Sequence, residues 1–430
     1  MLPDKQARVR LEGGSVRLRS VSLRQDRLVR GSPHDRATSL PCRGGRVRVE
    51  GQDVGDLTTA VRRFVREVLV PAEPAVEEND AIPAAIVEQL RSFGLFGMTI
   101  PEAYGGLGLC MLAEARVAFE IGYAAPAFRS YFGTSNGVGT LGILLDGTDE
   151  QKRRYLPRIA KGAIMAAFCL TEPDAGSDAA AITTRARRDG DDYVISGTKR
   201  FVTNAPQAGL FTVFARTADK DAGIAGISTF LVDRERAGIE IGPLDRKMGF
   251  RGSQSADVRF DECRVPAATL LGGKEGVGFK TAMRCLDHAR IHMAAISVGL
   301  CTRLIDEGVR HALGRKQFGR AIAQFQLIQA MLADSEAECF AARAMVEAAA
   351  RAKDQGEPVT KQAACCKYFA TEAAGRIADR VLQLHGGYGY LKDFPIERLY
   401  RDVRLLRLYE GTSQIQQLVI ARELLAEKAR

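Results

Sequence analysis

The chain has no tryptophan, only five histidines and no cysteine pair of the kind that binds zinc. Its nine cysteines include one adjacent pair, Cys365 and Cys366, but no Cys-x-x-Cys motif. This spacing argues against a tetrahedral zinc site and against a small disulfide scaffold. We therefore expect reduced thiols in the core or at the surface.

Long apolar runs are also missing. No run approaches the roughly 18 residues that a membrane-spanning helix needs, and the N-terminus lacks the apolar stretch of a secretory signal. The sequence therefore predicts a soluble, cytoplasmic protein with no membrane partner.

Three of the histidines lie where a metal site could be considered. His288 and His292 are four residues apart in a region with helical spacing, and His385 lies further along the chain. No cluster of Asp, Glu or Cys with matching spacing accompanies them, so we expect structural histidines and no metal. The glycine-rich segment 272–278 lacks the Gly-Lys-Ser/Thr ending of a phosphate-binding loop, and we interpret it as a connection that opens a helical region.

The positive charge of the chain is concentrated at its start. Residues 1–50 contain 12 Lys and Arg against 5 Asp and Glu, which leaves 49 basic and 47 acidic residues in the remainder. A basic segment with few aromatic residues buries little surface, so we expect it to be disordered and assign it no function. If it were a transit segment the location would be the mitochondrial matrix, but its acidic residues favour a mis-assigned start at least as much. The near-neutral remainder predicts no nucleic-acid partner.

A chain of 430 residues with 46% hydrophobic content exceeds what one core usually covers, so two or three domains are expected. Helical spacing dominates residues 51–165, short β-branched and aromatic runs separated by Gly and Asp turns dominate 166–273, and long Ala-rich amphipathic segments follow in 274–430. We expect strands at 193–195, 211–214, 227–232 and 258–260, and helices at 277–313, 325–354, 360–384 and 412–428. The predicted fold is mainly α with a central β domain, and the last four helices form an antiparallel bundle.

The most informative segment is Leu-Tyr-Glu-Gly-Thr-Ser-Gln-Ile-Gln at 408–416. If Tyr409 and Leu408 exclude water, desolvation raises the pKa of Glu410 towards the pH at which a general base works best. Gly411 would let the backbone approach a ligand closely. The alternative is an ordinary helix start, with Thr412 or Ser413 as the N-cap.

Two further segments suggest ligand contacts. Residues 170–178 combine Pro173 and Gly176 with short polar side chains, which is typical of a binding loop or of a tight turn. Phe201 and Thr203, two apart in a predicted strand, would share one face and suit an aromatic heterocycle. A strand with a core phenylalanine is the alternative.

Taken together and in this order, these segments resemble the acyl-CoA dehydrogenase family of FAD-dependent flavoproteins over residues 51–430. Further matching segments are 100–108, 315–319 with Gln326, and 383–389. The resemblance implies a helical N-terminal domain, a β-barrel-like middle domain and a C-terminal four-helix bundle. It also implies FAD as cofactor, an acyl-CoA substrate, an electron-transfer flavoprotein as partner, and a homotetramer.

By the same resemblance, residues can be assigned one at a time. Glu410 matches the catalytic base, and the other position at which some branches place that base is Ala289 here, which cannot accept a proton. Residues implied at the flavin are Phe168, Leu170, Thr171, Gly176, Ser177, Phe201, Thr203, Thr412 and Gln414, with Arg315, Phe318, Gln326, Gln383 and Gly387 reaching the FAD of a neighbouring subunit. Residues implied at the acyl-CoA are Ser177, Asp287, Arg290, Tyr409 and Gly411. For Arg290, a salt bridge with Asp287 is an equal alternative.

The sequence departs from the family pattern at two rings. Position 201 is often Trp and position 168 often Tyr in relatives, whereas this chain has Phe at both, so stacking area is smaller and a hydroxyl is missing. An acyl-CoA oxidase that uses oxygen and a divergent nucleic-acid-binding flavoprotein remain alternative functions. The acyl chain itself is not predicted, although its pocket is expected around residues 130–145 and 280–290.

Overall fold

The computed structural model describes residues 51–429, and of residues 51–53 it describes only the backbone. The expectations for residues 1–50 therefore lie outside the described part. Between residues 51 and 429 no helix is long and apolar enough to cross a membrane.

The first part of the described chain is helical, as predicted. The helices are α1 (Gly51–Phe64), α2 (Val70–Asn79), α3 (Ala84–Ser92), α4 (Met111–Ile121), α5 (Pro126–Asn136), α6 (Val138–Asp146) and α7 (Asp149–Ala160), with a π-helical turn (Val65–Leu69) between α1 and α2. A capping box starts α7, because Thr148 accepts from the backbone of Gln151 while the Gln151 side chain accepts from Thr148. The chain bends between α5 and α6 at Gly137, whose φ of −119° and ψ of −113° lie outside the helical region.

The middle part forms a curled seven-stranded sheet. Its strands are β1 (Ala166–Cys169), β2 (Arg185–Asp189), β3 (Asp192–Thr203), β4 (Leu210–Arg216), β5 (Ile227–Asp233), β6 (Ile239–Leu244) and β7 (Ser255–Pro266), in the order β1-β4-β2-β3-β7-β6 with β5 paired to β4. All four predicted strand runs lie inside β3, β4, β5 and β7, so this expectation is confirmed. One face buries a core that includes Ile195, Phe211, Phe230 and Phe260.

One detail of the sheet differs from the prediction. The pairing of β3 with β7 shifts register between Lys199 and Val202, and Phe201 within this bulge has a φ of +56°. The regular alternation that was used to place Phe201 and Thr203 on one face is therefore interrupted between them.

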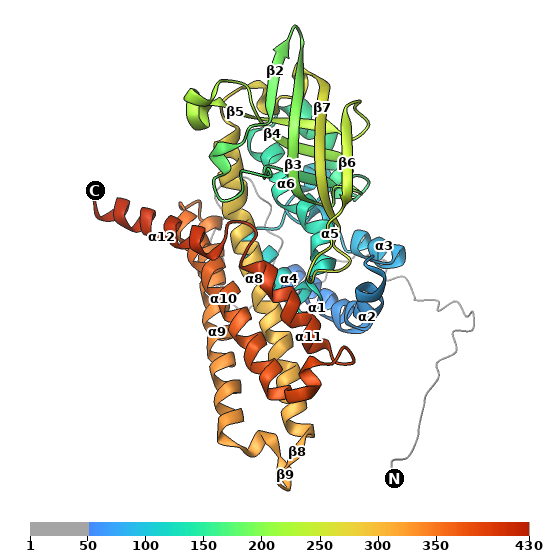
Figure 1. The fold of residues 1–430 in the computed structure, drawn as a ribbon, viewed down its shortest axis with the longest axis vertical. Helices are drawn as coiled ribbons and strands as arrows, with labels where there is room; N and C mark the ends of the chain where they lie inside the picture. The colour runs from blue at the N-terminus through green and yellow to red at the C-terminus, as the bar shows by residue number, and fades with distance from the viewer. Residues whose placement is uncertain (1–50, 430) are drawn as a thin grey trace, which may run out of the picture. The chain divides into compact units, whose positions relative to one another are not determined.

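The last part contains α8 (Gly278–Gly314), the hairpin β8 (Lys316–Gln317) and β9 (Arg320–Ala321), α9 (Gln326–Asp354), α10 (Thr360–His385), α11 (Pro395–Leu406) and α12 (Ser413–Lys428). Each of the four predicted helices is present within one residue at either end. The prediction missed α11, which packs against α8 and α10 and forms the fourth helix of the bundle. The predicted fourth helix, α12, instead packs on α10 and projects away from the bundle in Figure 1.

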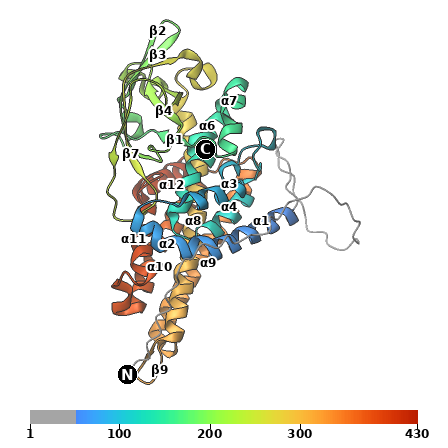
Figure 2. The same cartoon turned by 90° about the vertical axis from the view of Figure 1, so that its right-hand side faces the viewer.

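Figures 1 and 2 show how these parts meet in the described chain: the sheet lies near one end of α8, and α9, α10 and α11 pack along the rest of this long helix as the bundle. Helix α4 packs on α8 and α9, while α6 contacts both β1 and α8. The residues singled out from the sequence lie on or next to β1, β3, α8, the β8–β9 hairpin, α9, α10 and α12. They therefore come from the middle and last parts of the described chain.

Candidate active site

Glu410 lies in the turn between α11 and α12, in a backbone conformation that few residues adopt. Its φ is +55° and that of Gly411 is +88°. The positive φ favours glycine at 411, and a Cβ there would lie 2.6 Å from Nε2 of Gln416 and displace that amide. The Gln416 amide donates to the carbonyl oxygens of Glu410 and Gly411, each at 3.0 Å, and holds the turn.

The turn is also a helix start. Thr412 is the N-cap of α12 and its hydroxyl accepts from the backbone N–H of Ile415 at 3.2 Å. The two interpretations of this segment are therefore compatible, because a capped helix can begin two residues after a strained carboxylate.

Burial raises the pKa of Glu410 above its ordinary value, and the cations Arg129, Arg290 and Lys367 oppose this shift. The direction and the main cause agree with the sequence prediction. Of the two neighbours named there, Leu408 is 46% exposed and contributes little to drying the carboxylate.

Tyr409 is the neighbour that packs inward. Its ring meets that of Phe250 edge-on at 6.1 Å, and its hydroxyl donates to the sulfur of Met293 at 3.4 Å. Phe250 has a φ of +58°, and its backbone N–H donates to Oδ1 of Asp402 at 2.6 Å. Helix α11 thus holds the loop that presses on Tyr409.

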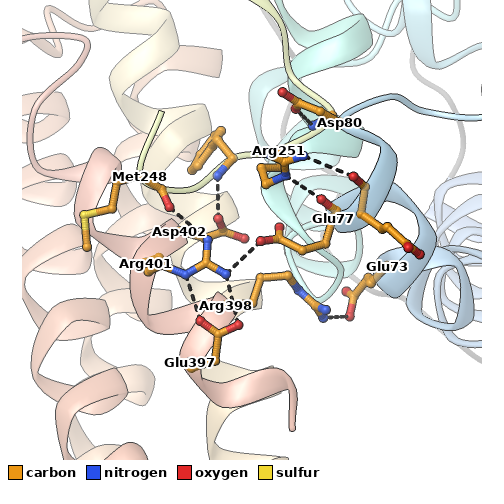
Figure 3. Close-up of polar contacts among 12 residues, drawn as sticks. Glu73, Glu77, Asp80, Met248, Arg251, Glu397, Arg398, Arg401 and Asp402 are labelled. Carbon is orange, nitrogen blue, oxygen red and sulfur yellow. Dashed lines mark hydrogen bonds and ion pairs between the residues drawn. The ribbon is translucent and has the colours of Figure 1, made fainter. Parts of the chain in front are cut away.

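Figure 3 shows how this loop, residues 245–254, is fixed between α2 and α11. Arg401 donates to the carbonyl oxygen of Met248 and to Glu77, both at 2.8 Å, and Arg251 donates to backbone carbonyls at the end of α2. Arg398 pairs with Glu73 at 2.6 Å. These links fix the 245–254 loop, whose Phe250 packs against Tyr409 in the candidate site.

The predicted flavin-lining segment begins in β1 and continues into the loop after it. Phe168 is half-buried and meets Phe214 edge-on at 4.8 Å, Leu170 is buried, and Gly176 and Ser177 are exposed. Thr171 is half-buried. The next residue, Glu172, anchors the loop, because its carboxylate accepts from Lys199 Nζ at 2.7 Å and from the backbone N–H groups of residues 183 and 184 at 2.6 and 2.9 Å.

The ring of Phe201 is 61% exposed, so the alternative of a core phenylalanine is wrong. The Arg200 guanidinium lies 4.6 Å from the centre of that ring, and Thr203 is half-buried two residues on. An exposed ring held in a strained backbone is available to stack on a planar ligand.

A second group of predicted residues lies far along the bundle. A pocket of about 1080 Å³ is lined by Arg315, Phe318, Gln326 and Gly387, among others. Phe318 is 92% exposed and has a φ of +51°. Gln383 lies on α10 outside this lining, and Thr412 and Gln414 lie instead at the start of α12.

The predicted substrate contacts Asp287 and Arg290 form a salt bridge of 2.9 Å, so the alternative named for Arg290 is confirmed. Arg290 is buried, and its Nε also donates to the carbonyl oxygen of Glu410 at 3.4 Å. Asp287 accepts from the hydroxyl of Thr360 at 2.7 Å. Ala289, between them, is buried in an apolar cluster that contains Val138.

Sequence reasoning missed Lys367 and Arg129. Lys367 donates to the carbonyl oxygen of Gly411 at 2.7 Å, and burial lowers its pKa to about 8. A signal for Arg129 was available, because it is the only charged residue between Glu120 and Asp146. A single charge inside an apolar helical stretch indicates a partner or a function.

The histidines at 288 and 292 both contact Glu114, at 2.9 and 2.7 Å, and Nδ1 of His385 donates to the carbonyl oxygen of Val381 in its own helix at 2.7 Å. Within residues 54–429, no group of three or more His, Cys, Asp or Glu side chains could hold a metal ion. The eight cysteines of the described chain are free thiols.

Known proteins resemble this chain over most of its length. Models of the N-terminal, middle and C-terminal domains of acyl-CoA dehydrogenases match residues 52–163, 167–263 and 276–425. Acryloyl-CoA reductase (NADH) from Anaerotignum propionicum is 42% identical over 371 residues, which cover 86% of this chain and 93% of the relative.

Solved structures agree. Butyryl-CoA dehydrogenase from Megasphaera elsdenii is 33% identical with a TM-score of 0.83, and the match covers 86% of this chain and 98% of that one. A chain in a structure described as the electron transferring flavoprotein of Acidaminococcus fermentans is 36% identical with a TM-score of 0.84, covering 88% and 99%. With the three domains matched in order and the carboxylate in its strained turn, this chain belongs to the acyl-CoA dehydrogenase family.

Proposed function

We propose that the chain oxidises an acyl-CoA thioester to the trans-2-enoyl-CoA, with Glu410 removing the α-proton, and passes the electrons to an electron-transfer flavoprotein. The family makes it an oxidoreductase that acts on CH–CH groups, with FAD as its cofactor. The substrate, the role of each residue and the electron acceptor belong to the proposal.

The observation that carries the proposal is the turn at Glu410. The carboxylate is desolvated, which suits a base that must take a proton from a weakly acidic carbon. Among the described residues, the backbone N–H of Glu410 donates to no group. A thioester carbonyl placed against this N–H would be polarised as negative charge develops on it, and one such donor is typically worth about 3 kcal/mol in the transition state.

The side chains of the candidate site fit FAD. Exposed Phe201 offers a stacking surface, while Thr171 and Thr203 offer hydroxyls at partly buried positions. The distant pocket adds exposed Phe318 and the guanidinium of Arg315, which suits a phosphate because its planar fork can pair two oxygens. When bound, FAD would accept the hydride that leaves the β-carbon.

For the acyl group, we expect contacts from the apolar side chains of α6 and α8. Val138, Leu141, Cys285 and Ala289 form one cluster, which Phe168 also touches. The small residues in α6 do not by themselves create room, since a Cβ on Gly142 would lie 3.3 Å from the methyl group of Thr281.

An acceptor assay tests the proposal. Purified protein is incubated with butyryl-CoA and an artificial one-electron acceptor without oxygen, and the CoA ester is analysed by mass spectrometry. Loss of two hydrogen atoms supports the dehydrogenase, whereas recovery of unchanged ester from this and from longer, branched and aromatic thioesters contradicts it. Rapid peroxide formation in air would instead favour an oxidase.

The reverse direction has its own support, because the relative from Anaerotignum propionicum is named a reductase. The same site could transfer a hydride to an enoyl-CoA and return a proton from Glu410. Oxidation of NADH on addition of an enoyl-CoA and an electron-transfer flavoprotein would assign this direction.

The proposal also includes the oligomeric state of the protein. The pocket of Phe318 and Arg315 is lined by the last residues of α8 and α10, whereas the Glu410 carbonyl oxygen contacts Arg290 in the first half of α8. This separation supports the expectation that the pocket serves the FAD of a second copy. We therefore expect a homotetramer, and light scattering of the purified protein checks it.

A further inference from the structure

Lys367 is a fully buried lysine without an acidic partner. It lies on α10 and is 0% exposed. Between residues 54 and 429 its ammonium nitrogen forms one hydrogen bond, to the carbonyl oxygen of Gly411 at 2.7 Å, and no ion pair. Burial lowers its pKa to about 8, so the ammonium form predominates at pH 7. Burial of an unpaired cation costs folding free energy, which points to a role for its one contact.

The other buried lysine of residues 54–429 shows the contrast. Lys199 is also 0% exposed, but its Nζ pairs with the carboxylate of Glu172 at 2.7 Å. That pair compensates the charge and ties β3 to the loop after β1. Lys367 has no such compensation, so ion pairing does not explain its place in the core.

The carbonyl group that Lys367 holds belongs to the turn of the proposed base. Gly411 follows Glu410, and their φ values are +88° and +55°. The amide of Gln416, near the start of α12, donates to both carbonyl oxygens at 3.0 Å. Arg290 Nε from α8 adds a longer contact of 3.4 Å to the Glu410 carbonyl. Side chains from three helices therefore hold two successive carbonyl groups of this turn.

These two carbonyl groups determine the geometry of the turn. A peptide group is planar, so an oxygen that is held in place fixes the orientation of its whole peptide plane. Fixing the planes after Glu410 and after Gly411 restricts the ψ angles of both residues, and with them the direction in which the Glu410 side chain leaves the backbone. A positive φ at a residue other than glycine persists only where the surroundings hold it. The shorter of the two bonds to the Gly411 carbonyl comes from Lys367.

Helix α10 holds the flanks of the turn as well. The carboxylate of Glu372, further along this helix, accepts from Nη1 of Arg407 at 3.2 Å and from the hydroxyl of Ser413. Arg407 precedes the turn and Ser413 follows it, so one helix contacts both flanks and the middle of the segment. Because α10 is long and packs against α8 and α9, it is a rigid support.

We propose that Lys367 and Gln416 are positioning residues, which hold the carbonyl of Gly411 so that the carboxylate and the backbone N–H of Glu410 stay in the arrangement that proton removal requires. The inference rests on the proposed function of Glu410 and deepens it. Misplacement of a reacting group by about 1 Å can lower a rate by about 10²-fold, so loss of these bonds should act on the reaction more than on substrate binding.

Lys367→Met tests the proposal in the FAD-containing protein, because methionine is similar in length but has neither charge nor donor. Without substrate, hydrogen–deuterium exchange of the backbone amides in the segment 407–416, followed by mass spectrometry, should become faster. The rate of flavin reduction by butyryl-CoA at saturation should fall by about 10- to 100-fold, whereas the half-saturating concentration should change by less than about threefold.

Stability separates positioning from a merely structural role. Lys367→Met removes a buried, unpaired ammonium while Gln416 still donates to the Gly411 carbonyl, so its Tm should equal or exceed that of the wild type. Lys199→Met is the matched control. It removes a buried lysine from an ion pair, so it should lower the Tm without a selective rise in exchange at 407–416.

Gln416→Leu removes the other donor to the same carbonyl and tests the proposal even if Lys367→Met does not fold. It should show the same fall in rate with little change in half-saturating concentration. In the double variant the two losses in rate should be non-additive, because both bonds hold one carbonyl group.

Unchanged exchange and unchanged rates in folded, FAD-containing variants would overturn the inference, and so would a fall in the Tm of Lys367→Met as large as that of Lys199→Met. A wild-type flavin that no thioester reduces would instead contradict the proposed function, and exchange in the turn would still report on Lys367. The two failures are therefore distinguishable.

Discussion

At the scale of single residues, strained backbone conformations occur at or next to positions that are proposed to contact a ligand. Phe201, Phe250, Phe318 and Glu410 all have φ values between +51° and +58°, a region that side chains other than glycine rarely adopt. Two of these are exposed rings and one is the proposed base. Strain of this kind persists only where the surrounding structure fixes it, as Gln416 does for Glu410.

Glu410→Gln is the direct test of the base. The amide keeps the shape of the side chain but cannot accept a proton, so the rate of flavin reduction by an acyl-CoA should fall by about 10²- to 10⁴-fold. Stopped-flow absorbance measures this rate, and the FAD content should stay that of the wild type. Full activity in the variant would remove Glu410 from the mechanism.

The sequence predicts Glu410 and its raised pKa because the drying ring, Tyr409, is the adjacent residue. It does not predict that Arg129 and Lys367 oppose this rise in pKa, because these residues lie on α5 and α10, far from Glu410 in the sequence. Local patterns identify the proposed base, whereas the charges that shift its pKa depend on tertiary packing.

At the scale of secondary-structure elements, the segment after β1 is tied to β3 by a buried ion pair. Lys199 and Glu172 lie 2.7 Å apart with side chains 0% and 4% exposed. Removal of one partner leaves the other charge buried and unpaired, so Lys199→Met should destabilise the fold by about 3–5 kcal/mol. A lower Tm and weaker FAD retention would show this.

The double variant Lys199→Met with Glu172→Gln is the matched control. It removes both charges while the amide oxygen can still accept from the backbone of residue 184 or 183, so part of the Tm should return. If Lys199→Met alone is as stable as the wild type, the ion pair does not hold the segment.

The link between α11 and the 245–254 loop predicts a pH dependence. Burial raises the pKa of Asp402 to about 7, whereas an unfolded aspartate titrates near about 4. Folding therefore takes up a proton between these values, and the contribution of Asp402 to stability falls as the pH rises from about 4 to about 7 and is constant above.

Asp402→Asn keeps an oxygen that can accept from the backbone of Phe250 but does not titrate. Its Tm relative to the wild type should therefore rise between pH 4.5 and pH 7 and then level off, by the linkage just described. Asp379→Asn, at an exposed position on α10, is the control and should show no such trend. A Tm difference that does not depend on pH would contradict a protonated Asp402.

The elements that the sequence predicts well are those with long apolar periodicity, and α8, α9 and α10 agree within one residue at each end. Helix α11 was missed because it is short and rich in charge. Its buried or half-buried Arg398, Arg401 and Asp402 find their partners on α2 and in the loop of Figure 3, which no local pattern reveals.

At the scale of the whole molecule, the three family domains begin at residue 52. Deletion of residues 1–50 should therefore leave FAD content, Tm and flavin reduction unchanged. Any salt-dependent DNA binding of the full chain should disappear with the deletion, because the remainder is nearly neutral, with 49 basic and 47 acidic residues. DNA binding retained by residues 51–430 would favour the nucleic-acid-binding alternative.

The order of a helical, a β and a second helical part was predictable because each has its own periodicity. The meeting of these parts at one site was not, since it depends on contacts such as that of α6 with both β1 and α8. The family resemblance supplied what periodicity could not.

The central claim is that an acyl-CoA delivers a proton to Glu410 and a hydride to the flavin. The most direct measurement is an anaerobic titration of the purified protein with straight, branched and aromatic acyl-CoAs, followed at roughly 450 nm, where oxidised flavins absorb. We predict that one class bleaches the flavin and that Glu410→Gln does not respond on the same time scale. A bound yellow flavin that none of these thioesters bleaches would contradict the account.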